Sequence, residues 1–193
     1  MKSVLPQRVV DDPEEELALL VEEARDGSRE AFDSLIRRFE RRVMRTALYL
    51  TGNLADAEDV AQEVYIKVFR FLGDQREADK LERWIYRITV NTVRDLRRRR
   101  VLRLPLEVVT AVSRWRDPVA RREVRSRMLA ALSRLSAKER ASFVLTQLEE
   151  LETAEAAAIL GCTPVTVRGH LHSARAKLRR SFREFEDWVW TDF

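Results

Sequence analysis

The sequence predicts an all-α protein: two small helical domains joined by a linker, the second ending in a helix-turn-helix. Apolar residues recur at spacings of three and four residues through most of the 193-residue chain, which is the period of an amphipathic helix. Only five glycines and five prolines are present, and no segment shows the alternation of a strand. The helical period is lost around Pro105 and Pro118, which exclude helix interiors. We therefore expect a linker at residues 101–120.

Residues 1–13 are interpreted as a leader, and the first domain is predicted to span residues 14–100. Its first helix carries an apolar stripe that ends before Gly27. Ser28 has the side chain of a good N-cap and is expected to begin the second helix. That helix should end at residues 51–53, a Thr-Gly-Asn sequence that tolerates left-handed backbone.

Two further helices are expected in the first domain. The third begins among acidic residues, which are favourable near the positive end of a helix dipole, and ends near Leu72 and Gly73. A charged loop at residues 74–80 follows. The fourth helix begins near Leu81 and ends in the four arginines of residues 97–100.

The second domain is predicted at residues 121–181 and contains four helices. The first of them buries Met128 and Leu132, and Ser136 with Glu139 has the spacing of a capping box that begins the next. The last two helices form the helix-turn-helix. An aromatic tail at residues 182–193 follows, and we expect it to pack back on the second domain or to contact a partner.

The helix-turn-helix is encoded by the chemistry of its turn. Gly161 suits the left-handed end of the first helix, Thr163 can cap the second, and Pro164 fits its first turn. In the second helix, apolar residues at spacings of four and three form a buried stripe of Val167, Leu171, Ala174 and Leu178.

The polar and cationic residues of this helix lie largely off the stripe. Side chains of these types bind phosphate and read base edges in a major groove. The candidates are Thr166, Arg168, His170, His172, Ser173, Arg175 and Lys177. The simpler interpretation is an amphipathic hairpin with a solvated basic face.

Three segments in this order carry a family resemblance: residues 55–69, residues 84–99 and the helix-turn-helix. On these three segments, the chain resembles the extracytoplasmic-function (ECF) group of sigma-70 family sigma factors. These proteins are the promoter-recognition subunits of bacterial RNA polymerase. The resemblance covers about residues 14–180. It implies a sigma factor that binds core polymerase and recognises the minus-ten and minus-thirty-five promoter elements.

An acidic stripe on the third helix is unsuited to DNA. Its acids are spaced by three and four residues, so they line one face. In the family the corresponding helix docks on a coiled coil of the large polymerase subunit. The resemblance assigns this role to Asp56, Asp59, Gln62 and Glu63. The alternative is a solvated helix face that benefits from the helix dipole.

The fourth helix carries the residues that the resemblance assigns to the minus-ten element. An amide can read a base, and guanidinium groups pair with phosphate oxygens. The candidates are Asn91, Arg94, Arg97 and Arg98. The arginine run is also consistent with a plain solvated helix end. In the second domain, Glu152 stands where the family often has a capping serine, and Thr153 is expected to cap one residue later.

Composition excludes several classes of protein. The net charge of +4 results from 36 basic and 32 acidic residues that are unevenly placed. A single cysteine excludes a disulfide framework and a cysteine-based zinc site, and His170 and His172 point to different sides of a helix. We find no phosphate-binding or nucleophile motif, so no catalytic residue, metal or cofactor is predicted, and the chain is not expected to be an enzyme.

The start of the chain lacks the apolar stretch of a signal peptide, and no segment reaches the ~20 apolar residues that span a membrane. We expect a cytoplasmic protein. Its expected partners are core RNA polymerase and promoter DNA, with an anti-sigma factor as a further partner that is common among relatives. Two alternatives remain: a dimeric helix-turn-helix regulator that binds an operator without polymerase, and an adaptor without DNA binding.

Overall fold

The computed structural model describes residues 13–74, 80–102 and 119–182, and all its regular elements there are helical. The helices are α1 (Pro13–Arg25), α2 (Arg29–Thr51), α3 (Leu54–Phe71), α4 (Leu81–Leu102), α5 (Val119–Ser133), α6 (Ala137–Phe143), α7 (Thr153–Leu160) and α8 (Pro164–Phe182). A 3₁₀ turn follows α3, and a π-helical turn, Val144–Leu148, follows α6. The predicted all-α class is confirmed. The leader up to residue 12, most of the charged loop and of the linker, and the tail after residue 182 lie outside the described residues.

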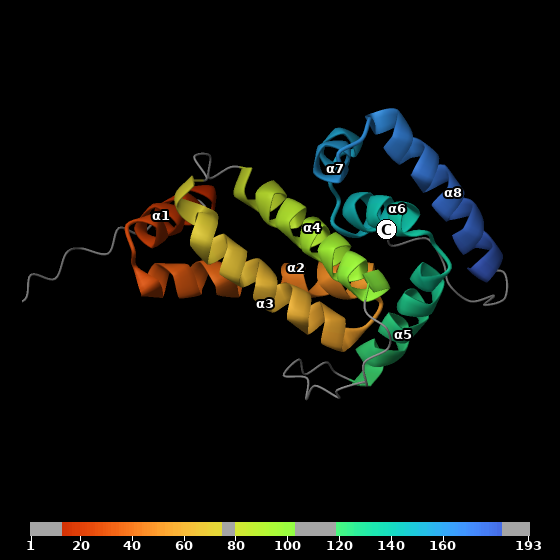
Figure 1. Cartoon of the computed structure of the whole chain (residues 1–193), viewed down its shortest axis with the longest axis horizontal. Coiled ribbons are helices and arrows are strands. Elements are labelled where there is room, and N and C mark those ends of the chain that lie inside the picture. Colours follow the sequence, from red (N-terminus) through yellow and green to blue (C-terminus); the bar gives the residue numbers. More distant parts are fainter. Residues whose placement is uncertain (1–12, 75–79, 103–118, 183–193) are drawn as a thin grey trace, which may run out of the picture.

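Helices α1 to α4 form the N-terminal unit (Figure 1). The predicted cap of α2 is present, because the Ser28 hydroxyl accepts a hydrogen bond from the Ala31 N–H at 3.2 Å. Gly52 ends this helix with a φ of 79°, which favours glycine. Asn53 then caps α3 by accepting from the Asp56 N–H at 3.3 Å. These two residues turn the chain so that α3 packs on α2.

Helices α5 to α8 form the C-terminal unit. Within this unit, α6 begins with the predicted capping box. The Ser136 hydroxyl accepts from the Glu139 N–H at 3.3 Å, and the Glu139 carboxylate accepts from the Ser136 N–H at 2.8 Å. Gly161 ends α7 with a φ of 69°, and the Thr163 hydroxyl caps α8 by accepting from the Thr166 N–H. The predicted helix-turn-helix is therefore confirmed, with its apolar stripe buried as expected.

Some predicted boundaries were wrong. Helix α4 continues two residues past the expected end at residue 100, and α5 begins at Val119, inside the expected linker. Arginine is a good helix former and the next proline is Pro105, so nothing stops α4 earlier. Thr153 does not cap α7. The helix begins at Thr153, preceded by Glu152, whose N–H donates to the Glu155 carboxylate at 3.2 Å.

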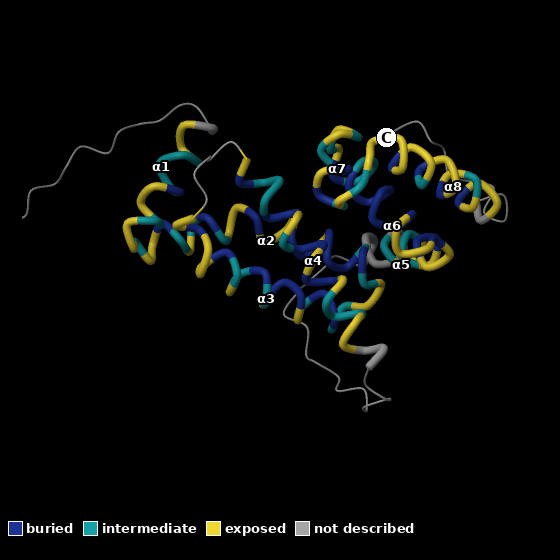
Figure 2. Tube along the Cα trace, turned by 45° about the horizontal axis from the view of Figure 1, so that its top comes forward, coloured by how far each residue is buried: buried dark blue, intermediate teal, exposed yellow. Residues whose placement is uncertain are grey.

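The two units are packed against each other. Buried residues of both belong to one continuous apolar core, which Figure 2 shows as dark stretches on the facing sides of the helices. Helix α4 contacts α7, and α2 contacts the π-helical turn. The prediction of two domains joined by a linker did not indicate that the two units would pack against each other.

Candidate functional site

The acidic face of α3 is only partly exposed. Asp59 and Gln62 are exposed, whereas Asp56 is buried, with 5% of its surface accessible. Asp56 lies in the first turn of α3, where this helix begins to pack on α2. Glu63 is half-buried and forms ion pairs with Lys67 at 2.9 Å and Arg99 at 3.7 Å. The surface of α3 therefore presents Asp59 and Gln62, not the full predicted set.

Sequence reasoning missed exposed apolar residues on the same helix. Ile66 and Phe69 are exposed, Phe69 to 68%. They continue the line of Asp59 and Gln62 at spacings of four and three, so residues 59, 62, 66 and 69 form one ridge, which we call the α3 ridge. The Phe69 ring meets the Phe32 ring edge-on at 5.1 Å. Ile66 and Phe69 lie off the buried stripe of Val60, Val64 and Val68, and this position was the sequence signal that could have identified them as exposed.

The predicted DNA-binding residues of α4 divide into two kinds. Asn91 and Arg98 are exposed. Arg97 is half-buried and donates to the Leu50 carbonyl at 2.6 Å, near the end of α2. Burial lowers the pKa of the Arg97 guanidinium from its ordinary value. Arg97 therefore satisfies a carbonyl of the last turn of α2 in this structure, which is a structural role that sequence reasoning did not assign.

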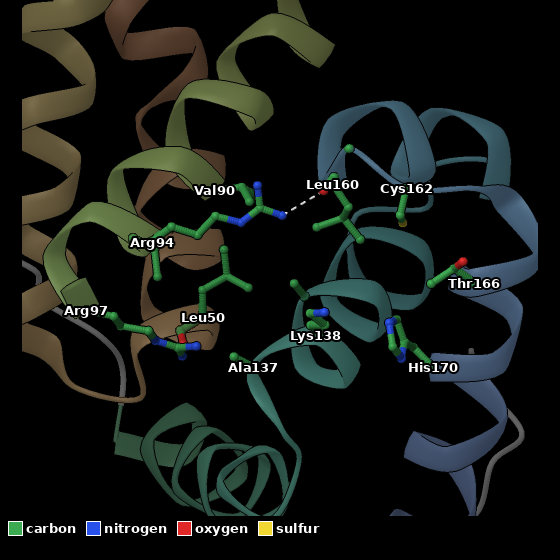
Figure 3. Close-up of a pocket in the computed structure, with 13 residues that line it drawn as sticks. Leu50, Val90, Arg94, Arg97, Ala137, Lys138, Leu160, Cys162, Thr166 and His170 are labelled. Carbon is green, nitrogen blue, oxygen red and sulfur yellow. Dashed lines mark hydrogen bonds between the residues drawn. The ribbon is translucent and has the colours of Figure 1, made fainter. Parts of the chain in front are cut away.

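Arg94 is also engaged, although it is exposed. Its guanidinium donates to the Leu160 carbonyl at the end of α7 at 2.9 Å, shown as the dashed line in Figure 3, and to the Asn91 amide oxygen at 3.4 Å. Around this contact lies a cavity of about 180 Å³ between the two units. Its walls include Lys138, Thr166 and His170 (Figure 3).

The polar face of α8 is largely exposed. Arg168, His172 and Ser173 are exposed, and His170 is half-buried on the cavity. The other three predicted residues of α8 form hydrogen bonds. Thr166 bonds to the Thr163 hydroxyl, Arg175 donates to Gln147 at 2.9 Å, and Lys177 donates to Glu139 at 2.7 Å. Sequence reasoning missed Val165, which is exposed at the start of α8, where a methyl group can contact thymine.

The contact with Lys177 has an electrostatic consequence. The hydrogen bond from Lys177 holds the pKa of the Glu139 carboxyl below its ordinary value, with a further contribution from the Ser136 N–H. The same carboxylate belongs to the capping box of α6. Lys177 is therefore tied to the supporting helix while its neighbours on α8 face solvent.

Neither a metal centre nor a membrane span is found in the described part of the chain. Within residues 13–74, 80–102 and 119–182, no group of three His, Cys, Asp or Glu side chains could hold a metal ion. Over the same ranges, no helix is long and apolar enough to cross a membrane.

Comparison with known proteins places two family models on these units. Sigma-70 region 2 matches residues 35–103, and sigma-70 region 4 matches residues 125–178. The chain is 34% identical over 160 residues to the ECF RNA polymerase sigma factor SigE of Mycolicibacterium smegmatis, covering 77% of this chain and 60% of SigE. It is 33% identical over 156 residues to the ECF RNA polymerase sigma factor SigM of Mycobacterium tuberculosis, covering 80% of this chain and 78% of SigM.

A solved structure has the same architecture. The structure of CnrH in complex with the cytosolic domain of CnrY matches with a TM-score of 0.66 and 27% identity, covering 88% of this chain and 98% of that chain. CnrH of Cupriavidus metallidurans is an RNA polymerase sigma factor. These similarities favour polymerase-dependent promoter recognition over the operator-binding dimer.

Proposed function

Because this chain belongs to the ECF RNA polymerase sigma factors, which direct promoter-specific transcription initiation, we propose that three helices divide the task. The α3 ridge docks on core polymerase, α4 binds the minus-ten element, and α8 reads the minus-thirty-five element. The proposal places the protein in the cytoplasm, with polymerase and the chromosome.

The chemistry of the α3 ridge supports docking on a protein. Asp59 and Gln62 supply an anionic and a polar group, and Ile66 and Phe69 supply apolar surface next to them. Exposed aromatic groups beside polar ones are typical of protein interfaces, and a carboxylate is repelled by DNA. We assign the coiled coil of the large polymerase subunit as the occupant, with Glu63 and the buried Asp56 in supporting positions.

Of the four predicted residues on α4, Asn91 and Arg98 are exposed, and we assign them to the DNA strand. An amide can recognise a base edge, and a guanidinium can neutralise a phosphate. Arg94 joins them if its contact with Leu160 is released. Arg97 contributes chiefly by holding the end of α2.

On α8, the exposed face that includes Arg168, His172 and Ser173 is the one we place in the major groove. It lies opposite the buried stripe that fixes α8 on α6 and α7. Arg175 and Lys177 then contact phosphates or keep the helix in place. This exposed basic face, on the second helix of a helix-turn-helix, is the observation that carries the proposal.

A protein partner is also proposed. CnrH is bound by the cytosolic domain of CnrY in its solved structure. We propose that an anti-sigma factor binds this chain in a comparable way and competes with polymerase.

In vitro transcription tests the proposal. Purified core polymerase is incubated with genomic fragments, with and without the chain, and new transcript starts are mapped. We expect discrete starts only when the chain is present. The absence of new starts when the chain is added would contradict it.

Charge reversal locates the docking surface. Asp59→Arg, alone and with Gln62→Arg, is expected to abolish the new starts and to weaken core binding without unfolding the chain. Glu22→Arg on α1 is the matched control, because Glu22 is an exposed acid outside the proposed surfaces. Equal polymerase affinity of the Asp59 and Glu22 variants would remove the docking assignment.

A further inference from the structure

The cavity beside the helix-turn-helix is lined by basic side chains. Arg94 and Arg97 enter it from α4 (Figure 3). Lys138 of α6 and His170 of α8 line it from the C-terminal unit. None of the described residues that line the cavity is acidic. Basic residues along one helix usually form a solvated face, but positive groups from three helices that meet around one cavity create a local field that attracts an anion.

Hydrogen bonds within the protein do not neutralise the charge of this cavity. The Arg94 guanidinium donates to the Leu160 carbonyl at 2.9 Å. The Arg97 guanidinium donates to the Leu50 carbonyl at 2.6 Å. A carbonyl oxygen satisfies a donor but carries no net charge, and a guanidinium has several N–H groups. The positive charge and the other N–H groups therefore remain for an anion.

A second arginine donates to the Leu50 carbonyl. Arg140 of α6 is buried, with 9% of its surface accessible, and its Nη1 lies 3.3 Å from this oxygen. The guanidinium groups of Arg97 and Arg140 thus share one neutral acceptor. Burial lowers the pKa of both groups, and the charge of Arg97 lowers the pKa of Arg140 further. An anion bound next to Arg97 would relieve this repulsion.

The size and the walls of the cavity restrict its ligand. Its volume of about 180 Å³ is below the ~300–1,000 Å³ of sites for drug-sized ligands. A phosphate or pyrophosphate group is small enough, whereas a polypeptide helix with its diameter of ~10 Å is not. Val90, Val93 and Leu160 form an apolar part of the wall. Apolar surroundings lower the local dielectric constant and strengthen the attraction between a cation and an anion.

We propose that this cavity is a binding site for a small phosphorylated anion, either an inorganic phosphate species or a small phosphate monoester. Arg94, Arg97 and Lys138 bind its oxygens, and His170 lies at the same wall as Lys138. Guanidinium and ammonium groups are the side chains that pair most strongly with phosphate. The site does not depend on the proposed function, because its ligand is a free anion and not DNA.

Titration calorimetry of the full chain with pyrophosphate at low ionic strength tests the site. We expect saturable binding in the parent. Lys138→Met and Arg94→Met each remove one cation of the cavity and should weaken binding about tenfold, the scale of one hydrogen bond from a charged group. Both residues are exposed, so neither change is expected to unfold the chain. Arg41→Met is the matched control, because Arg41 is exposed on α2 and does not line the cavity, and its affinity should equal that of the parent.

The single cysteine of the chain locates the bound anion. Cys162 lines the cavity, so its alkylation by iodoacetamide reports on this space. We expect pyrophosphate to slow alkylation over the concentrations at which it binds, and the Lys138→Met variant to need about tenfold more. The proposal would be overturned by a lack of saturable binding, by equal affinities of the Lys138→Met, Arg94→Met and Arg41→Met variants, or by binding that leaves alkylation unchanged.

A short single-stranded oligonucleotide distinguishes a free anion from a DNA phosphate. Stronger protection of Cys162 by the oligonucleotide than by pyrophosphate, at equal phosphate concentration, would assign the cavity to DNA and overturn the proposal. Stronger protection by pyrophosphate supports it. Transcript mapping tests the proposed function separately, so the loss of either proposal leaves the other standing.

Discussion

The basic side chains of α4 and α8 have different uses in the structure. On α4, Arg94 and Arg97 donate to main-chain carbonyls of Leu160 and Leu50, near the ends of α7 and α2. On α8, Arg168 is exposed, and Arg175 and Lys177 donate to side chains, not to main-chain carbonyls. Carbonyls of a last helical turn lack partners within the helix and carry negative potential, so a guanidinium can serve them instead of a phosphate. Positive charge on a helix therefore does not by itself indicate a nucleic-acid contact.

The largest effect is expected when the support of α8 is removed. Leu178 is buried in its apolar stripe, with 1% of its surface accessible. Leu178→Ala should lower the free energy of unfolding by about 2–5 kcal/mol, because it deletes buried methyl groups and leaves a cavity. Urea unfolding measures this loss. The adjacent Arg179→Ala is the control, with an expected change within about 0.5 kcal/mol, and equal losses would contradict the buried role of the stripe.

The next effect concerns reading of DNA by α8. Arg168→Ala should weaken polymerase binding at the minus-thirty-five element by about 1–3 kcal/mol for a base-reading contact, with unfolding unchanged. Binding of the polymerase complex to promoters that differ at single minus-thirty-five positions measures this loss. Selective loss at one base supports base reading. A uniform loss on every sequence would instead make Arg168 a phosphate contact.

A smaller effect separates the two kinds of arginine on α4. Arg97→Ala should cost about 1–2 kcal/mol of unfolding free energy, the scale of one hydrogen bond from a charged group that is partly exposed. Arg98→Ala should leave stability within about 0.5 kcal/mol and reduce the salt dependence of DNA binding by about one unit of slope. Urea unfolding and salt titrations measure the two quantities. A larger loss of stability for Arg98→Ala than for Arg97→Ala would show that the roles assigned to these two arginines are wrong.

The smallest effect concerns Lys177 of α8. Like Arg94, it donates a hydrogen bond to another part of the protein. Its bond to Glu139 lowers the pKa of that carboxyl below the ordinary value of 4.5. The stabilisation is therefore complete above pH ~4.5 and is lost as pH falls through the lowered pKa of the folded state. Glu139→Gln should flatten this part of the stability profile, measured by urea unfolding at acid pH. Glu23→Gln, on exposed α1, should retain the parent slope, and an unchanged slope in the Glu139 variant would exclude this linkage.

Local chemistry predicted most helix boundaries. Ser28, Ser136 and Thr163 cap helices through their hydroxyls, and Gly52 and Gly161 end helices with positive φ, as their residue types indicate. These features depend on neighbours within a few residues, so the sequence contains the information. The failure at Thr153 has the same origin, because Glu155 three residues after Glu152 also satisfies the first turn of α7.

The candidate site was predicted less completely. Spacing places Asp56 and Asp59 on one face of a helix, yet Asp56 is buried and Asp59 exposed. The period of a helix gives the direction of a side chain but not the depth at which a neighbouring helix covers it. The exposed Ile66 and Phe69 were missed for the related reason that apolar residues are usually assigned to a core.

The sequence by itself determined the helices, most of their caps, the helix-turn-helix and the family, because each depends on local periodicity or on the order of short motifs. Only the tertiary structure decided that Glu149 meets Arg45, Thr46 and Tyr86, residues 104, 103 and 63 positions away. Nothing local to Glu149 specifies these partners. A contact between distant segments depends on how whole helices pack, and that packing also decided which arginines of α4 remain available to DNA.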